Sequence, residues 1–461
     1  MNPLEISPAR FRRIVDRVAD ESVSLLENLD RMPSFPEGAT GEALQQRFAR
    51  PLPSDGEGMG AFDDLRDLIE GSRVNSPRFF AYVMGSGEPV AAAADLLASV
   101  LNQNVTSWRS GPAAATIERT VVGWLAEAVG CRGFQGSLCG GGSAANLMAL
   151  AMAREAKLPS NERGAEPAVM YASQEVHMSI GKAVALLGLG RENLRLIAVD
   201  DQFRMIPAEL EKAVEQDKKA GRKAIAVVAT AGTVNTGSID PLPEIAAIAR
   251  RHGLWLHVDG AFGMLAAIAA PEKFAGIEQA DSLSLDPHKW LYQPVDCGCL
   301  LFREAAAAHA AFAHSGDYAR SLYQNPLEAF AFFEESLELS RRFRALKLWL
   351  SLRYHGLNAF RAAIQDDLRR AQMLAKRIDD EPLLERLGPV PLSAVCFRHK
   401  SGGDDLQAAI LQRVIARRRV YISNATIQGR FALRACVMNH RSKDEDVLAV
   451  VEEVLAAAGE L

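Results

Sequence analysis

The chain has 461 residues, enough for a large hydrophobic core and more than one domain. Hydrophobic residues make up 48% of the sequence and charged residues 24%, as in an ordinary globular protein. The formal net charge of −5 argues against nucleic acid or an anionic membrane as a partner.

The cysteines and the apolar runs favour a cytoplasmic protein. No C-x-x-C pair occurs, so the cysteines are expected to be reduced core residues rather than disulfides or metal ligands, and no metal site is expected. The N-terminal residues lack the apolar segment of a signal peptide, and the longest apolar runs are too short to span a bilayer. The cysteines are Cys131, Cys139, Cys297, Cys299, Cys396 and Cys436.

The first part of the chain is predicted to be helical. Ser7-Pro8 is a typical helix start, with Ser as N-cap and Pro at the first helical position. The apolar residues that follow recur at helical spacing and form one stripe, which must pack on its own chain or on a second subunit. Residues 31–60 are rich in Pro and Gly and are predicted to be an extended connection. Residues 90–128 are predicted to form two helices broken near Gly111-Pro112.

From about residue 130 to 304, apolar strand patterns alternate with helix patterns. This alternation predicts an α/β fold with a mostly parallel sheet covered by helices on both faces. Residues 305–335 interrupt the pattern, as a mobile active-site loop would. The remainder predicts a smaller α+β domain. The predicted divisions are an N-terminal helical and extended segment (1–85), a large α/β domain (86–340) and a small C-terminal domain (341–461).

Lys289 is the first candidate for a reactive group. It follows the turn signal Asp286-Pro287 and is flanked by His288 and Trp290. Because proline keeps the preceding residue out of a helix, we expect Lys289 where a strand passes into a loop. Partial desolvation between an imidazole and an indole would favour the neutral amine, which forms Schiff bases with carbonyl compounds. An isolated lysine after a turn would otherwise be a surface residue.

Three further stretches place polar groups after predicted strands or before a helix. Asp259 closes an apolar run, where it could keep a proton on a cofactor's ring nitrogen or cap a turn. The stretch Cys139-Gly-Gly-Gly-Ser143 precedes a helix, so its amides could bind phosphate, although a flexible turn would look the same. His177 follows a strand and could stack on a flat cofactor or be structural.

The ordered set of these motifs resembles the group II pyridoxal-phosphate-dependent amino-acid decarboxylases, and most closely their aromatic L-amino-acid branch. The stretches Phe79–Tyr82 and Ser340–Trp349 resemble the family as well, so nearly the whole chain is covered. Each motif is weak alone, and the order and spacing make the resemblance specific. The core motifs are Gly140-Gly-Gly-Ser143, His177, Thr230-Ala-Gly-Thr233, His257-Val-Asp259-x-Ala261 and Pro287-His-Lys-Trp290.

The resemblance implies the fold type I architecture of pyridoxal phosphate enzymes, with pyridoxal 5'-phosphate as the cofactor. It implies that Lys289 holds the cofactor as a Schiff base, that Asp259 keeps the ring nitrogen protonated, and that His177 and Ala261 face the two sides of the ring. It also implies a homodimer with composite active sites. The other cofactor-binding residues implied are Gly142, Ser143, Thr230 and His288, and the substrate-binding residues are Tyr82 and Trp108.

The proton donor departs from the family pattern. The aromatic decarboxylases carry a loop tyrosine nine residues before an Arg-Arg-Phe-Arg motif, and counting back from Arg341 gives Phe332. Phenylalanine has no proton to donate, and related aldehyde synthases carry it at this position. A gap would bring Tyr318 or Tyr323 into the role instead. Decarboxylation to an amine is favoured, and oxidative decarboxylation to an aldehyde stays open.

Other classes fit the motifs less well. An aminotransferase is disfavoured by the Pro287–Trp290 context, and an inactive regulator would be expected to lack Lys289 or Asp259. A dinucleotide dehydrogenase would carry Gly-x-Gly-x-x-Gly, which Gly140-Gly-Gly142 does not match. The expected substrate is an L-amino acid, and Tyr82 in its aromatic context favours an aromatic one.

Overall fold

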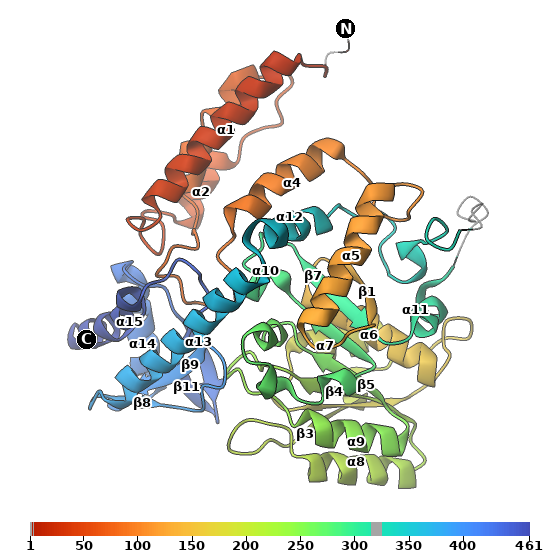
Figure 1. The fold of residues 1–461 in the computed structure, drawn as a ribbon. Helices are drawn as coiled ribbons and strands as arrows, with labels where there is room; N and C mark the ends of the chain where they lie inside the picture. Colours follow the sequence, from red (N-terminus) through yellow and green to blue (C-terminus); the bar gives the residue numbers. More distant parts are fainter. Residues whose placement is uncertain (1, 3, 315–324) are drawn as a thin grey trace.

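The computed structural model describes the chain except residues 1, 3 and 315–324 (Figure 1). Its larger sheet has seven strands: β1 (Gln135–Cys139), β2 (Val169–Ser173), β3 (Leu194–Ile197), β4 (Ala224–Thr230), β5 (Trp255–Asp259), β6 (Ser282–Leu285) and β7 (Gly298–Phe302). The order is β1-β7-β6-β5-β4-β2-β3. Strands β3, β2, β4, β5 and β6 are parallel, whereas β7 pairs antiparallel with β6 and β1. The prediction of a mostly parallel α/β sheet is confirmed.

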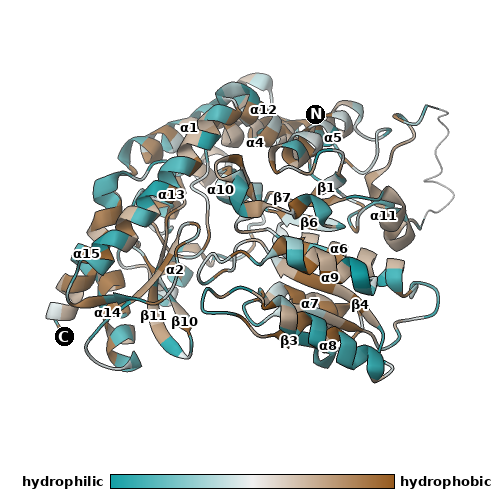
Figure 2. Ribbon diagram, turned by 60° about the horizontal axis from the view of Figure 1, so that its bottom comes forward, coloured by the Kyte–Doolittle hydropathy of each residue, from teal (hydrophilic) through white to brown (hydrophobic). Residues whose placement is uncertain are grey.

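Both faces of this sheet are buried, as its apolar strands require. Along β4, Val227 and Ala229 face one apolar cluster, and Ala226 and Val228 face the other. Figure 2 shows hydrophobic residues gathered along the strands. The first cluster takes in α5 (Pro112–Ala128), α8 (Pro207–Lys219), α9 (Leu242–His252) and α12 (Ala345–His355), and the second takes in α6 (Gly142–Lys157), α7 (Met178–Leu186) and α11 (Ala305–Phe312).

A second sheet forms the smaller α+β unit that the sequence predicts. Its strands are β8 (Leu384–Arg386), β9 (Ala394–His399), β10 (Ser423–Ile427) and β11 (Arg430–Cys436), in the order β10-β11-β9-β8, and every pair is antiparallel. Three helices contribute to its core: α13 (Leu357–Asp379), α14 (Asp404–Arg417) and α15 (Asp444–Gly459). Tyr421 precedes β10 and bridges to Phe79, which ties the N-terminal part of the chain to this unit.

The N-terminal segment projects from the rest of the chain (Figure 1). Helix α1 (Pro8–Asn28) begins where Ser7-Pro8 predicts, with Ser7 Oγ accepting a hydrogen bond from Arg10 N at 3.2 Å. No residue of α1 is buried among the described parts of the chain. The prediction of an extended connection over 31–60 is wrong in part, because Thr40 caps a helix there, α2 (Gly41–Phe48), by accepting from Ala43 N at 3.1 Å.

Two further expectations are met. The helices predicted over 90–128 are α4 (Pro89–Leu101) and α5, which are separated by residues 102–111. All six cysteines are free and buried, as predicted for reduced core residues. Among the described residues, no helix combines the length and the apolar character needed to cross a membrane.

Candidate active site

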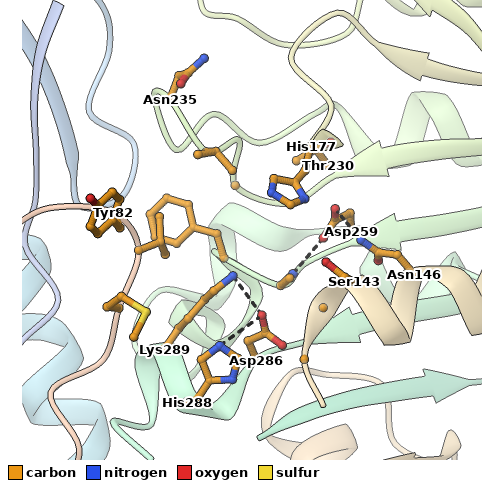
Figure 3. Close-up of a pocket in the computed structure, with 18 of the residues that line it drawn as sticks. Tyr82, Ser143, Asn146, His177, Thr230, Asn235, Asp259, Asp286, His288 and Lys289 are labelled. Carbon is orange, nitrogen blue, oxygen red and sulfur yellow. Dashed lines mark hydrogen bonds and ion pairs between the residues drawn. The ribbon is translucent and has the colours of Figure 1, made fainter. Parts of the chain in front are cut away.

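A cavity of about 500 Å³ lies at the carboxyl ends of β4 and β5 and reaches residues of the smaller sheet (Figure 3). This is the edge of a parallel sheet where ligands bind in open α/β folds. Among the predicted site residues, all but Trp108 line the cavity: Tyr82, Gly142, Ser143, His177, Thr230, Asp259, Ala261, His288 and Lys289. Segments far apart in the sequence therefore meet here.

Lys289 lies on a one-turn helix, α10 (Pro287–Trp290), rather than on the loop that the sequence predicts. Asp286 before it is extended, as a residue before proline should be, and Pro287 opens the turn. The Lys289 Nζ atom lies 3.0 Å from Asp286 Oδ2, and the side chain is 18% exposed. Trp290 is fully buried and stacks on Phe262, so the close neighbour of the amine is a carboxylate and not an indole.

Asp259 ends β5 and is only 5% exposed. Its Oδ1 atom accepts hydrogen bonds from Ser284 Oγ at 3.1 Å and Ala261 N at 3.2 Å. Its Oδ2 atom accepts from Asn146 Nδ2 at 2.9 Å. The bond from Ala261 N is the turn-capping contact that the sequence left as an alternative, and the carboxylate lines the cavity as well.

His177 lies at the N-cap of α7 and lines the same cavity as Asp259. Its Nδ1 atom accepts a hydrogen bond from Ser179 N at 3.3 Å and lies 2.8 Å from Ser179 Oγ. Burial is the largest influence on the imidazole and lowers the pKa of His177 below its ordinary value. The ring is therefore neutral at neutral pH, which suits a flat surface for stacking.

The glycines before α6 form a concave backbone at the cavity. Gly141 has a φ of 127°, which strongly favours glycine. A Cβ on Gly142 would stand 2.6 Å from Ala261 Cβ, so any side chain there would clash with Ala261. The free amides at the start of α6 and the helix dipole make this an anion-binding end. His288 is held beside it, with Nδ1 2.7 Å from the carbonyl oxygen of Cys297.

Among the lining residues that were not predicted as site residues, three have buried polar or charged side chains. Asn146 belongs to the Gly-rich stretch, and its only local signal is that asparagine is unfavourable inside a helix. Asp286 was interpreted only as part of a turn, yet its Oδ1 atom is buried and makes no hydrogen bond. Arg434 comes from β11 in the other sheet, and nothing in its local sequence points to the cavity.

Trp108 and Phe332 lie away from the cavity. Trp108 lines a separate surface pocket with Phe330, so it does not form an aromatic wall with Tyr82 in this chain. Phe332 is fully buried, with the Arg341 guanidinium 4.1 Å from its ring centroid and the Phe330 ring 4.8 Å away. The position obtained by counting back from Arg341 is therefore a core position. Tyr318 and Tyr323 lie outside the described residues.

Comparisons with known proteins identify the same fold and chemistry. Residues 53–400 match the pyridoxal-dependent decarboxylase conserved domain. The chain is 31% identical to the aromatic-L-amino-acid decarboxylase of Bacillus atrophaeus, over 99% of this chain and 97% of that protein. The crystal structure of Oryza sativa TDC with PLP and tryptamine superposes with a TM-score of 0.92 at 26% identity, covering 100% of this chain and 99% of that one. Rhodiola rosea 4-hydroxyphenylacetaldehyde synthase superposes with a TM-score of 0.90 at 26% identity and covers 100% of both chains.

The residues present fit pyridoxal 5'-phosphate. The N-terminal end of α6 offers amides for a phosphate, and Gly141 and Gly142 carry no side chain that could cover them. Lys289 lines the cavity with an amine that could bond the carbonyl carbon, and Asp259 lines it with a carboxylate that could pair with the ring nitrogen. The chain belongs to the pyridoxal-dependent decarboxylase family and is a pyridoxal-phosphate-dependent amino-acid decarboxylase.

Proposed function

We propose that this enzyme converts an aromatic L-amino acid to the corresponding amine and CO2, with Lys289 as the residue that carries the cofactor. The observation that carries the proposal is one cavity that joins the Lys289 amine, the Asp259 carboxylate and the amide-lined end of α6 to a wall containing Tyr82 and Phe262. The cavity thus combines cofactor chemistry with aromatic surface.

Each lining group has a role set by its place. When bound, pyridoxal phosphate supplies a protonated ring that accepts the electron pair left behind as CO2 departs. Asp259 keeps a proton on the ring nitrogen, and the donors around its carboxylate hold it in place. His177 would cover one face of the ring as a neutral imidazole, and the small side chain of Ala261 would leave the other face accessible.

The remaining lining residues would anchor and orient the cofactor. Lys289 would hold the cofactor through its amine, the group that reacts with an aldehyde. The amides of Gly142 and Ser143 and the side chain of His288 would hold the phosphate at the N-terminus of α6. Thr230, at the end of β4, completes the wall beside Asp259.

The charge of the cavity favours an aromatic over an acidic substrate. Among the described lining residues, Arg434 brings the only guanidinium, and it is 2% exposed. It donates to three backbone carbonyls, those of Tyr82 at 3.0 Å, Val234 at 2.5 Å and Asn235 at 3.2 Å. Because these bonds occupy Arg434, it is not available to pair with the side-chain carboxylate of an acidic amino acid.

A substrate panel tests this assignment. The holoenzyme is incubated separately with tryptophan, tyrosine, phenylalanine, histidine, glutamate and cysteine sulfinate, and amine, CO2 and peroxide are measured together. We expect amine and CO2 in equal amounts from at least one aromatic substrate and the lowest turnover with the two acidic ones. Preference for glutamate or cysteine sulfinate would contradict the argument from Arg434.

The buried position of Phe332 leads to a prediction about the product. Phe332→Tyr buries a hydroxyl beneath Arg341 with no room to reach the cavity, so we expect a loss of about 1–3 kcal/mol in the free energy of unfolding. We expect no change in the ratio of amine to aldehyde. Thermal or urea unfolding gives the first quantity and the product assay the second.

Phe333→Tyr is the matched control, because Phe333 is the adjacent residue and is only half-buried. Its added hydroxyl can reach solvent, so its effect on stability should be small. A shift from aldehyde toward amine in Phe332→Tyr would show that position 332 does reach the reacting atoms, and it would restore the reading of the chain as an aldehyde synthase.

We also propose that the enzyme is a homodimer. Two helices present apolar residues to solvent: α1 with Phe11, Val18, Val23 and Leu26, each 40–53% exposed, and α4 with Leu96, Leu97, Val100 and Leu101, each 48–56% exposed. Figure 1 shows α1 and α4 along the same side of the molecule. Contiguous apolar patches of this kind mark interaction surfaces.

Charged substitutions on α4 test whether the chain forms the proposed dimer. Leu97→Glu combined with Leu101→Glu places two carboxylates in the apolar patch, so the dimer should dissociate to monomer in sedimentation at about micromolar concentration. Leu383→Glu is the control, since Leu383 is 49% exposed but lies beside β8. A wild-type chain that sediments as a fully active monomer would contradict the proposal.

The domain limits and the compartment are proposals as well. We propose domains at 1–85, 86–340 and 341–461, supported by the two separate sheets within residues 135–302 and 384–436. We propose that the protein is cytoplasmic, supported by its six free cysteines.

A further inference from the structure

Asn146 is a buried amide at the wall of the cavity and at the centre of a hydrogen-bond network. It lies on α6 and is 1% exposed. Its Nδ2 atom donates to Asp259 Oδ2 at 2.9 Å and to Ser179 Oγ at 3.0 Å, and its Oδ1 atom lies 2.9 Å from His257 Nε2. Both amide hydrogens and one acceptor position are therefore used. Figure 3 shows Asn146 directed from α6 toward Asp259.

The network extends from Asn146 into the core. Trp255 Nε1, which can only donate, lies 2.8 Å from Ser282 Oγ. Ser282 Oγ also lies 2.9 Å from His257 Nδ1, and a hydroxyl can accept and donate at once. His257 is fully buried, and burial lowers its pKa to about 4, so the ring carries a single proton. With that proton on Nε2, His257 donates to Asn146 Oδ1 and Ser282 Oγ donates to Nδ1.

The Asp259 end of the network fixes the direction in which the hydrogen bonds run. An ionised Asp259 can only accept, so the Asn146 atom facing it at 2.9 Å must be the donor Nδ2. The second hydrogen on Nδ2 points at Ser179 Oγ, whose own hydrogen is directed to His177 Nδ1 at 2.8 Å. Ser179 N also donates to this nitrogen at 3.3 Å. A rotated amide would place oxygen against carboxylate.

We propose that Asn146 is a positioning residue that holds Asp259 and His177 in a fixed relation to each other, by donating one amide hydrogen to the Asp259 carboxylate and the other, through Ser179, to the His177 ring. This inference rests on the proposed function, because it takes Asp259 and His177 as the groups that contact the cofactor. The Asp259 carboxylate sets the orientation of the amide, and His257 Nε2 then donates to the amide oxygen.

The consequence for the cofactor site is electrostatic as well as geometric. Asp259 accepts three hydrogen bonds, and the one from Asn146 is the shortest of them. A hydrogen bond to a charged acceptor is stronger than one to a neutral acceptor. Removing this donor leaves Asp259 Oδ2 without its hydrogen bond in a buried site. The carboxylate then loses a contact that orients it and part of the hydrogen bonding that offsets the cost of burying its charge.

The first test is the dissociation constant of pyridoxal phosphate, measured by absorbance titration of the cofactor-depleted protein. Asn146→Leu has a similar size and cannot donate, so we expect this constant to rise about tenfold or more. Met148→Leu is the matched control, since Met148 is a buried residue of the same helix without a place in the network. It should bind the cofactor as the wild type does.

The second test separates donation from packing. Asn146→Asp keeps the shape but places a carboxyl group against Asp259, and two such groups share one proton. While protonated, the new carboxyl group donates as the amide did. As pH rises it loses the proton and the two charges repel, so the ratio of variant to wild-type dissociation constants should be larger at about pH 8.5 than at about pH 6.

Different experimental results would overturn the positioning role and the proposed function. A pH-independent ratio for Asn146→Asp, or cofactor binding by Asn146→Leu within about twofold of wild type, would overturn the positioning role. If Asn146→Leu does not fold, the ratio for the isosteric Asn146→Asp decides. A wild-type protein that shows no absorption band of lysine-bound cofactor would instead overturn the proposed function, and the positioning role with it.

Discussion

Lys289→Ala should abolish turnover. Without the amine, the cofactor has no covalent anchor and the substrate has no lysine link to displace, so we expect CO2 release to fall by at least about a thousandfold. The measurement is the rate of CO2 release at saturating substrate and cofactor. Lys182→Ala is the control, because Lys182 is an exposed lysine of nearby α7 outside the cavity lining.

A separate variant distinguishes lost chemistry from lost stability. Lys289→Ala removes the amine 3.0 Å from the buried Asp286 carboxylate. His288 Nε2 remains at 3.6 Å, but burial lowers the pKa of that ring, so it brings no positive charge at neutral pH, and the free energy of unfolding should fall by about 3 kcal/mol. Adding Asp286→Asn removes the unpaired charge and should recover stability. It should not recover turnover. Near-normal CO2 release by Lys289→Ala would show that another residue carries the cofactor.

Asp259→Asn should bind the cofactor weakly and react slowly. The amide keeps the shape of the side chain but cannot keep a proton on the ring nitrogen, which removes several kcal/mol of stabilisation of the developing negative charge. We expect kcat to fall by about two to four orders of magnitude. The cofactor dissociation constant, measured by absorbance titration, should rise as well.

Asp281→Asn is the control for Asp259→Asn. Asp281 is a part-buried carboxylate that accepts from Leu256 N at 2.7 Å, just before β6 and at the opposite end of the strands from the cavity. Losing its charge should affect stability and leave kcat near wild type. If Asp259→Asn retained kcat within about twofold of wild type, the role of Asp259 would be the turn cap at Ala261 N.

The local sequence pattern was sufficient to predict a site residue where that residue ends or follows a strand. Asp259 ends one strand and His177 lies in the loop after another, and the carboxyl ends of parallel strands meet at one edge, so their convergence followed from the fold class. The glycines before Ser143 could be predicted to form a phosphate site, because a helix N-terminus without bulky side chains lets its amides bind an anion. The strand preceding Lys289 was expected, but its one-turn helix was not, because four residues give no periodic signal.

Contacts that depend on tertiary packing could not be predicted from the local sequence pattern. Asn146 acts through residues of β5 and α7, and its partners become visible only when three elements are placed together. Arg434 reaches the cavity from the second sheet. Phe332 was placed by counting back from Arg341 without a gap, which assumes a loop of constant length. The structure has the Phe332 ring beneath the Arg341 guanidinium in the core.

Reduction of the holoenzyme with borohydride, followed by trypsin and mass spectrometry, tests the central claim most directly. Reduction fixes the cofactor on its lysine and blocks cleavage there. An adduct on Lys289 predicts one peptide spanning 274–303 that carries a pyridoxyl group, in place of the separate peptides 274–289 and 290–303. Recovery of those two peptides unmodified, with the pyridoxyl group on another lysine, would contradict the account.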